Sequence, residues 1–324
     1  MTKATEVLLV LILTASCGCV PRRAAAPEAL YAAVHRASVF VLLNGRHQGS
    51  GFFVDAEGLV ATAAHVVRGK ADGFEIVSPT VGRLKAERVA IDLGHDIALL
   101  RVPKRDAPYP ALPVAARMPP AGSPVFLFGD PVFRHRLLLA GAVAVARPTY
   151  DYSPGTGCYT RAFFVTGTSP QGTSGGCWVD GRGRVVGVQS GYLNSAKAPA
   201  GIAIVAPPDA LRALLATRAS AETTTLGTRL DELWTQPHGF IARFPKGTQG
   251  VVTVVPQKGG PVARAGLNKE SLITAIDGRP VAFVDDVLAA IRAKRPGDTV
   301  QLEVMDPDKP TRRIVTVHLA RVKE

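Results

Sequence analysis

Residues 50–65 read Ser50-Gly51-Phe52-Phe53-Val54-Asp55-Ala56-Glu57-Gly58-Leu59-Val60-Ala61-Thr62-Ala63-Ala64-His65. Two short apolar runs flank a turn of Asp, Ala, Glu and Gly, which is the pattern of a β-hairpin. The second run leads directly to His65. The segment therefore predicts a strand that delivers an imidazole at its end, where the ring can face a cleft.

The same pattern of short strands and turns continues on both sides, from Ser38 to about Val205. Strands this short, separated by Gly, Pro and Asp, are typical of an all-β sandwich or barrel. The predicted strands are 39–43, 51–54, 59–62, 97–102, 125–128, 137–145, 163–166 and 185–189. A helix is predicted at 207–216, where leucines recur at helical spacing after a Pro start.

A second unit follows a polar, small-residue linker at 218–225. Its predicted strands are 251–255, 272–276, 300–304 and 314–319. Between them lies one predicted helix, from Val284 to Ala293, with apolar residues at i, i+3, i+4 and i+7. One face of this helix can therefore pack on a small sheet.

Composition indicates a globular protein of two domains. The chain has 324 residues, 47% of them hydrophobic, and a formal net charge of +12. Lys and Arg are spread along the sequence without a continuous basic arm or a nucleic-acid-binding motif, so no nucleic-acid partner is expected. A diffuse positive charge of this kind is expected of a protein that functions near anionic lipid or cell-wall polymer. Alternatively, the charge only keeps the surface solvated and the protein soluble.

The N-terminus predicts export. Lys3 precedes a short apolar run, and Thr14-Ala15-Ser16-Cys17 is similar to the lipobox at which bacterial lipoproteins are cleaved and acylated. Cys17 is the predicted lipidated residue and would anchor the protein to a membrane. If an ordinary signal peptidase cuts instead, the protein is soluble in the same compartment.

Cys158 and Cys177 remain for the folded part. In an oxidising compartment they form a disulfide, or else they are two free, buried thiols; the sequence leaves both open. No Cys and His spacing matches a zinc site, so neither a metal nor a cofactor is expected.

Three residues carry the chemistry of acyl transfer in the order His65, Asp96, Ser174. Asp96 stands at the mouth of a buried strand, where a carboxylate can hold the imidazole in its useful tautomer. Ser174 lies between glycines, which lets the amides of Gly172 and Ser174 turn toward one point as an oxyanion hole. His95 points to the opposite face from Asp96 and is a bystander.

At these motifs the sequence resembles the HtrA/Deg-type serine proteases with a C-terminal PDZ domain. The resemblance rests on Gly49-Ser50-Gly51-Phe52 with the following Thr-Ala-Ala-His, on Asp96-Ile97-Ala98-Leu99-Leu100, on Gly172-Thr173-Ser174-Gly175-Gly176 and on Gly201-Ile202-Ala203-Ile204-Val205-Ala206-Pro207. It implies a mainly β fold. A chymotrypsin-like double β-barrel would cover 38–208, then a helix and linker 209–224, then a PDZ-like α+β domain 225–324. Before them, 1–19 would be the signal peptide and 20–37 a linker.

The sequence departs from the family at four places. Thr173 stands where Asn or Asp is usual and Cys177 where Pro is usual, both beside the catalytic Ser. In the second domain, Thr228 replaces an apolar residue, and Glu270-Ser271 replaces Gly-Asp. These changes put the shape of the oxyanion loop and peptide binding in question, but not the fold.

Specificity is predicted from the residue about six before the Ser, Thr168, since no acid lies between 165 and 173. Gln189, Ser190, Gly191 and Ile202 are the other predicted pocket walls. A cationic side chain would lack a partner there, so small or medium aliphatic residues are expected at the cleaved bond.

The second domain is expected to capture a C-terminal peptide as an added strand, with the carboxylate on backbone amides. The predicted contacts are Leu226, Gly227 and Thr228 in the loop, and Val284 and Leu288 on the helix.

Taken together, the sequence predicts a serine endopeptidase that hydrolyses unfolded or misfolded proteins through an acyl-enzyme. The resemblance implies a periplasmic location and a homotrimer. The alternative is a chaperone or PDZ scaffold that binds clients without cutting them. An α/β-hydrolase also has a G-x-S-x-G motif, but its acid and His follow the Ser, and here only His238 and His318 do.

Overall fold

The computed structural model describes residues 27–324 except 70–71, 132–135, 154–156, 196–197 and 308. The predicted signal peptide and Cys17 lie outside the described residues. Within them, no helix is both long enough and apolar enough to cross a membrane.

The first domain begins with a closed barrel of six strands in the order β1-β2-β3-β6-β5-β4. They are β1 (Ser38–Leu43), β2 (Arg46–Phe53), β3 (Leu59–Thr62), β4 (Phe74–Ser78), β5 (Gly82–Asp92) and β6 (Ile97–Arg101). Alternate side chains fill the interior, where Val41, Ile76 and Leu100 are fully buried. The predicted hairpin forms as β2 and β3, but His65 lies in a short helix after it, α2 (Ala64–Val67).

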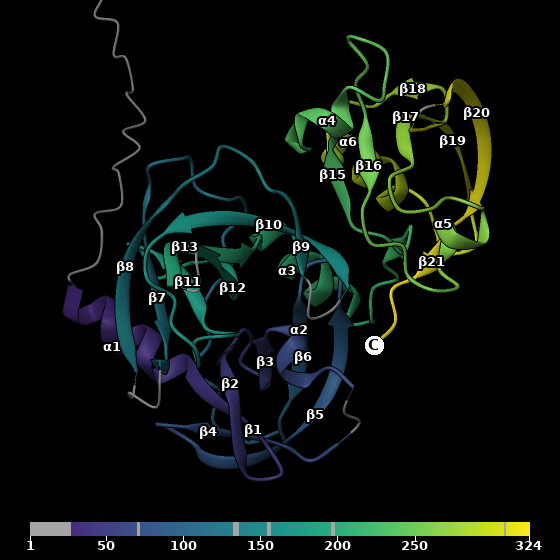
Figure 1. Cartoon of the computed structure of the whole chain (residues 1–324). Helices are drawn as coiled ribbons and strands as arrows, with labels where there is room; N and C mark the ends of the chain where they lie inside the picture. The colour runs from purple at the N-terminus through teal and green to yellow at the C-terminus, as the bar shows by residue number, and fades with distance from the viewer. Residues whose placement is uncertain (1–26, 70–71, 132–135, 154–156, 196–197, 308) are drawn as a thin grey trace, which may run out of the picture.

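A second barrel packs beside the first (Figure 1). Its strands are β7 (Pro124–Gly129), β8 (Leu137–Val143), β9 (Thr149–Ser153), β10 (Cys158–Thr166), β11 (Cys177–Asp180), β12 (Val185–Ser195) and β13 (Ala198–Ala206). β13 pairs with both β12 and β10, which closes six strands, while β9 extends the sheet from β10 as an edge strand. Trp178 and Phe163 are fully buried in this core.

Two helices frame the barrels. Residues 27–37, expected as part of a linker, instead form α1 (Pro27–Ala37). Leu30, Val34 and Ala37 recur at helical spacing and are buried against the barrel cores, which is why the segment folds as a helix. After β13, the predicted helix forms as α3 (Pro208–Thr217).

The C-terminal domain is a small sheet with helices against it. Its sheet order is β15-β16-β17-β19-β20, with a separate β14–β21 pair. The four residues predicted for the apolar face of α6 are all buried. The elements are β14 (Thr224–Thr225), β15 (Leu230–Glu232), η2 (Leu233–Thr235), α4 (His238–Ile241), β16 (Val251–Thr253), α5 (Pro261–Arg264), β17 (Leu272–Ile276), β18 (Arg279–Pro280), α6 (Val284–Arg292), β19 (Thr299–Asp306), β20 (Lys309–His318) and β21 (Ala320–Arg321).

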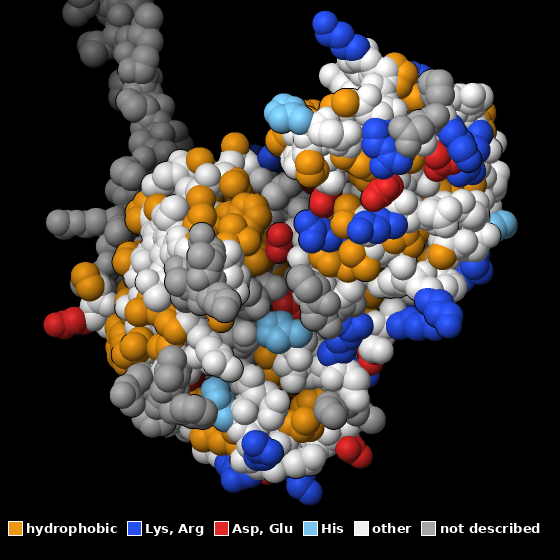
Figure 2. All heavy atoms as spheres, in the orientation of Figure 1, with side chains coloured by type: hydrophobic (Ala, Val, Ile, Leu, Met, Phe, Trp, Pro, Cys, Tyr) orange, Lys and Arg blue, Asp and Glu red, His pale blue; other side chains and the backbone are white. Residues whose placement is uncertain are grey.

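The two domains meet at the β9–β10 hairpin. Tyr159 of β10 belongs to the core cluster of the C-terminal domain, and Thr149 Oγ1 donates to Asp285 of α6 at 2.7 Å. Arg292 of α6 reaches back to the Tyr159 carbonyl at 2.5 Å. Figure 2 shows the two lobes in contact, with Lys and Arg side chains most numerous on the visible face of the C-terminal lobe. The predicted double barrel followed by an α+β domain is confirmed.

Candidate active site

His65 and Asp96 form a hydrogen-bonded pair between α2 and the start of β6. His65 Nδ1 lies 2.7 Å from Asp96 Oδ2, and the His65 amide donates to Asp96 Oδ1 at 2.8 Å. Asp96 has a φ of 56°, a left-handed conformation that non-glycine residues rarely adopt and that is concentrated at functional sites. The side chain of His65 is 37% exposed and that of Asp96 only 10%, so a substrate can reach the imidazole but not the carboxylate.

Ser190 is a third partner of this pair. Its hydroxyl donates to Asp96 Oδ2 at 2.5 Å. The register of β12 against β13 shifts between Gln189 and Gly191, and such a bulge re-aims the side chain beside it. Sequence reasoning gave Ser190 only as a pocket wall and missed this contact, because a bulge leaves no periodic signal.

The pair raises the basicity of the imidazole. Burial by itself lowers the pKa of His65, but the charge of Asp96 and the hydrogen bond to it outweigh burial, so the net pKa of His65 is raised above its ordinary value. With Nδ1 held by Asp96, Nε2 is the ring nitrogen left to exchange a proton.

The Ser174 loop lies against the segments on both sides of His65. The Ser174 carbonyl accepts from the Ser50 amide at 2.7 Å. A Cβ added to Gly49 would lie 2.7 Å from that carbonyl oxygen and 2.8 Å from Val66 Cγ2, which places the Ser174 backbone beside α2. Gly175 has a φ of 83°, and a Cβ there would lie 2.2 Å from the Ser50 carbonyl, so only glycine fits. Among the described residues no hydrogen bond joins His65 to Ser174.

The loop before Ser174 is held by its own turn. Gly172 has a φ of 98°, and its carbonyl accepts from Ser50 Oγ at 3.0 Å. Thr173, one of the departures from the family pattern, is buried, and its hydroxyl donates to the Pro170 carbonyl at 2.7 Å. In the described part of the chain, neither the Gly172 nor the Ser174 amide has a protein acceptor.

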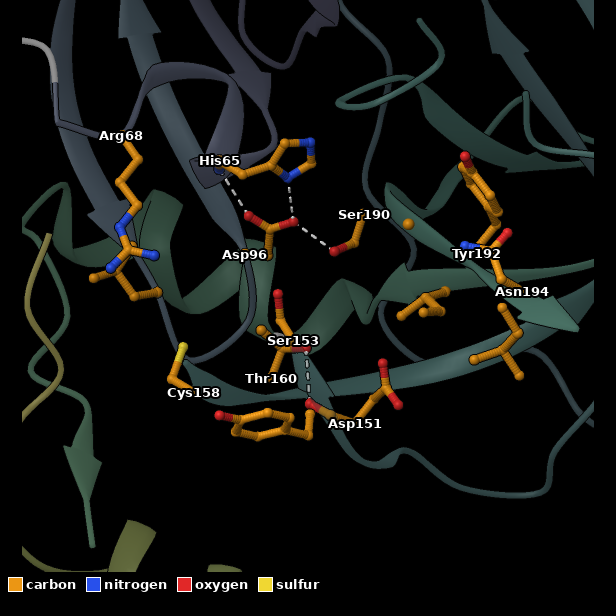
Figure 3. A pocket seen from close by; sticks show the side chains of 15 residues that line it. His65, Arg68, Asp96, Asp151, Ser153, Cys158, Thr160, Ser190, Tyr192 and Asn194 are labelled. Carbon is orange, nitrogen blue, oxygen red and sulfur yellow. Dashed lines mark hydrogen bonds and ion pairs between the residues drawn. The ribbon is translucent and has the colours of Figure 1, made fainter. Parts of the chain in front are cut away.

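A cavity of about 690 Å³ adjoins the pair (Figure 3). Of the predicted pocket residues, Ser190 and Gly191 line it. Gln189 does not, because its side chain is buried between the Trp178 indole and the Gly191 carbonyl, at 2.7 and 2.6 Å. Thr168 is exposed and Ile202 half-buried, both outside this lining. The other lining residues are His65, Arg68, Leu93, Asp96, Asp151, Tyr152, Ser153, Cys158, Thr160, Tyr192, Leu193, Asn194 and Ile204.

No disulfide joins Cys158 and Cys177 in the described residues, which favours the second of the two alternatives that the sequence left open. Cys158 lies in the wall of the cavity, whereas Cys177 is fully buried in β11. Burial raises the pKa of the Cys177 thiol to about 12, so this sulfur stays protonated.

Two family models match these regions. A trypsin-like peptidase domain matches residues 49–188, and a PDZ domain matches residues 226–316. The chain has the domain architecture of an HtrA-type serine protease.

Known relatives support this architecture. A protein of Brucella suis named "Probable periplasmic serine endoprotease DegP-like" is 26% identical over 83% of this chain and 52% of its own length. A protein of the same name from Pseudomonas fluorescens is 27% identical over 81% of this chain and 54% of its own. The chain therefore spans about half the length of the curated relatives it matches.

Solved structures share the fold. "HtrA-type protease AlgW with decapeptide" has a TM-score of 0.64 at 19% identity and covers 90% of this chain and 98% of its own. A serine endoprotease from Yersinia pestis has a TM-score of 0.62 at 18% identity and covers 92% of this chain and 100% of its own.

In the PDZ domain, the edge where a peptide would add is already in contact with the HtrA-type protease domain. The Tyr159 hydroxyl donates to the Leu230 carbonyl and accepts from the Leu230 amide, each at 2.8 Å. Leu230 lies on β15, the end strand of the sheet. These are the backbone groups that an added strand would use. Val284 borders the cavity that remains, of about 430 Å³, whereas Leu288 lies inside the domain core.

The predicted carboxylate loop is also internally bonded. The Gly227 amide donates to Thr225 Oγ1 at 2.9 Å, and the Leu226 carbonyl accepts from the Val262 amide at 3.2 Å. Thr228 is buried, and its hydroxyl donates to the Arg229 carbonyl at 2.9 Å. The polar side chain at this departure from the family pattern is therefore satisfied within the loop.

Proposed function

We propose that this chain is a serine endopeptidase that hydrolyses peptide bonds through an acyl-enzyme, with His65, Asp96 and Ser174 as its triad. The observation that carries the proposal is the carboxylate of Asp96. It accepts from His65 Nδ1, from the His65 amide and from Ser190 Oγ, at 2.7, 2.8 and 2.5 Å. Three such bonds fix one orientation and one tautomer of the imidazole, as a general base requires.

The steps follow from these positions. His65 Nε2 takes the proton of Ser174 Oγ as the oxygen attacks the substrate carbonyl, and Asp96 stabilises the imidazolium that forms. His65 then gives this proton to the leaving amine, and water repeats the sequence on the acyl-enzyme. We expect the hydrogen bond between His65 and Ser174 to form when the substrate binds, because catalytic hydrogen bonds are often long or poorly aligned in unliganded enzymes.

Backbone groups complete the site. The Gly172 and Ser174 amides are the donors for the oxyanion, and losing one such donor typically costs about 10²–10³ in turnover. Beyond Ser190, β12 pairs with β13 through Gly191 and Tyr192, while the strand's other edge borders the cavity. An extended substrate can add there as a strand.

The remaining proposals concern place and partners. The relatives named above are periplasmic endoproteases by name, so we infer export, with cleavage and acylation at Cys17 as the anchor. Substrates would be unfolded or misfolded proteins, with C-terminal peptides as ligands of the PDZ domain and a homotrimer as the assembly. The proposed boundaries are 38–208 for the protease domain and 225–324 for the PDZ domain.

The test compares the full chain with Ser174→Ala. We expect the wild type to degrade unfolded casein and to be labelled by a fluorophosphonate probe, and we expect Ser174→Ala to do neither. The labelling measures nucleophile activation without depending on the choice of substrate.

Ser123→Ala is the matched control, because the recorded hydrogen bonds of Ser123 all come from its backbone, which Ala retains. It should keep full activity. Equal casein degradation by wild type and Ser174→Ala would remove the assignment of Ser174. Client binding without cleavage by the wild type would favour the chaperone reading.

A further inference from the structure

The β9–β10 hairpin presents two different faces. Because side chains alternate along a strand, Asp151 and Ser153 point to one side of β9, while Tyr150 packs toward the PDZ core. Asp151 thereby lines the catalytic cavity, in the same wall as Thr160 of the neighbouring strand (Figure 3). Tyr152 borders both that core and the catalytic cavity, and Asp151 also borders the smaller cavity at the PDZ edge. An acidic side chain thus stands in the cavity that also holds His65.

The Asp151 carboxylate has no counter-ion. Within the described ranges, no Lys, Arg or His lies in an ion pair with it, and its carboxylate accepts one hydrogen bond, from the backbone of Tyr152. This contrasts with Asp96 in the same cavity, whose carboxylate accepts three hydrogen bonds. Burial raises the pKa of Asp151, and the single backbone hydrogen bond from Tyr152 offsets only part of this effect. A cation supplied from outside would compensate the rest of this effect.

Arg68, the one Lys or Arg side chain in the described lining, is committed elsewhere. Arg68 donates to the carbonyl of Lys323 at the C-terminus. Figure 3 shows Arg68 on the opposite side of the cavity from Asp151. It therefore does not neutralise the carboxylate.

The surroundings of Asp151 suit a long cationic side chain. Leu93, Tyr152 and Ile204 supply apolar surface to the cavity, along which the methylenes of Lys or Arg can lie. Tyr192, 37% exposed, adds an aromatic face that favours a cation nearby. An aliphatic or acidic side chain would leave the carboxylate uncompensated.

We infer that Asp151 forms a subsite for a Lys or Arg of the substrate, a few residues away from the cleaved bond. This inference rests on the proposed peptidase function and names a feature of its substrates. It concerns a different position from the residue that donates the cleaved carbonyl, for which the Thr168 region offers no acid.

The decisive experiment uses two series of fluorogenic decapeptides that are otherwise built of neutral residues. In the first series, a single Arg is placed at each position in turn; in the second, norleucine takes the place of that Arg. We expect the wild type to cleave the Arg peptide about tenfold faster in kcat/KM than the norleucine peptide at one or two positions, the gain typical of one partly buried charge pair. Asp151→Asn should lose this preference while cleaving the norleucine peptides as the wild type does. Unchanged cleavage of these neutral peptides also reports that the variant is folded.

Asp106→Asn is the matched control, because Asp106 is exposed on a loop outside the cavity and undergoes the same chemical change. It should retain the Arg preference. Peptide binding to Ser174→Ala, measured by fluorescence anisotropy, separates the two proposals. A preference for Arg that depends on Asp151 in binding, without cleavage by the wild type, would refute the peptidase and keep the subsite. Cleavage with no Arg preference at any position, or a preference unchanged in Asp151→Asn, would overturn the subsite alone.

Discussion

The catalytic cleft and the peptide edge of the PDZ domain are two binding regions in different states. In the cleft, the polar groups hold one another in place, and the imidazole of His65 stays accessible with 37% of its side chain exposed. At the PDZ edge, the backbone groups of Leu230 are bonded to Tyr159 of the other domain. One region is ready for a ligand, whereas the other must first release a contact within the chain.

One hairpin borders both regions. Asp151 and Thr160 face the catalytic cavity, while Tyr150 and Tyr159 face the PDZ domain. A short two-stranded wall therefore separates the two regions, and a peptide that displaces Tyr159 acts on the same strands that line the cleft. The difference teaches that a motif predicts which residues form a binding surface, but not whether another segment already contacts it.

The largest expected effect is in the cleft. Asp96→Asn should lower kcat about 10⁴-fold, because an amide in place of the carboxylate no longer fixes the imidazole in the required tautomer. Steady-state cleavage of a fluorogenic peptide measures the loss.

Asp92→Asn provides the comparison. Asp92 holds His95 at 2.7 Å in a pair of the same kind, outside the catalytic cavity. The variant Asp92→Asn should lower the melting temperature but change kcat little, because the Asp92–His95 pair lies outside the catalytic cavity. Equal losses of kcat in the two variants would show that Asp96 acts only on the fold.

The pH profile probes the same pair. His65 must be neutral to accept the proton, and its pKa is raised above its ordinary 6.5 because the charge of Asp96 and the hydrogen bond to it together outweigh burial. We therefore expect kcat/KM to fall as the pH drops through this raised pKa, by about 100-fold two units below it. In Asp96→Asn only burial remains, so the inflection of the residual activity should move to lower pH. An inflection at the same pH in both proteins would contradict the pairing.

An intermediate effect is expected at the PDZ edge. Tyr159→Phe removes the hydroxyl that binds both backbone groups of Leu230. A peptide then has no hydroxyl to displace, and since the two bonds together contribute about 2 kcal/mol net, its affinity should rise about 30-fold. Fluorescence anisotropy with decapeptides that have a free carboxylate and an apolar last residue measures the change.

Tyr109→Phe is the control, because it also removes a buried hydroxyl, one that donates to the Pro103 carbonyl in the first domain. Peptide affinity should be unchanged by it. If Tyr159→Phe bound peptide no more tightly than the wild type, β15 would not be the site of peptide addition.

The sequence predicts those parts of both regions that depend on local pattern. The hairpin before His65 and the strand after Asp96 form as predicted, because their apolar runs are continuous and bounded by turns. β4, β5, β9 and β11 were not among the predicted strands; in β5 and β9, the polar and half-buried residues carry no clear alternation.

Contacts between distant segments could not be predicted from the sequence. The approach of Ser190 to Asp96 depends on a bulge, and the contact of Tyr159 with Leu230 depends on how two domains pack. Neither leaves a sign in the spacing of residues along the chain. The apolar face predicted for the helix that contains Val284 was correct. The sequence did not predict, however, that β9 of the other domain lies beside this helix.

The smallest expected effect lies away from both regions, in the PDZ domain. Glu270 stands where the family has Gly and has a φ of 78°, a conformation that strains residues with a Cβ. Glu270→Gly should therefore raise the free energy of unfolding by roughly 0.5–1 kcal/mol, after the greater freedom of Gly in the unfolded chain is offset. Its contact with Arg243, at 3.4 Å on the surface, contributes little.

Glu270→Ala is the matched control, since it removes the same carboxylate but keeps the Cβ, and it should not stabilise the domain. Urea denaturation measures the free energy of unfolding of both variants. If Glu270→Gly and Glu270→Ala were equally stable, the backbone at this position would not be strained. The departure from the family pattern would then have no energetic consequence for the PDZ fold.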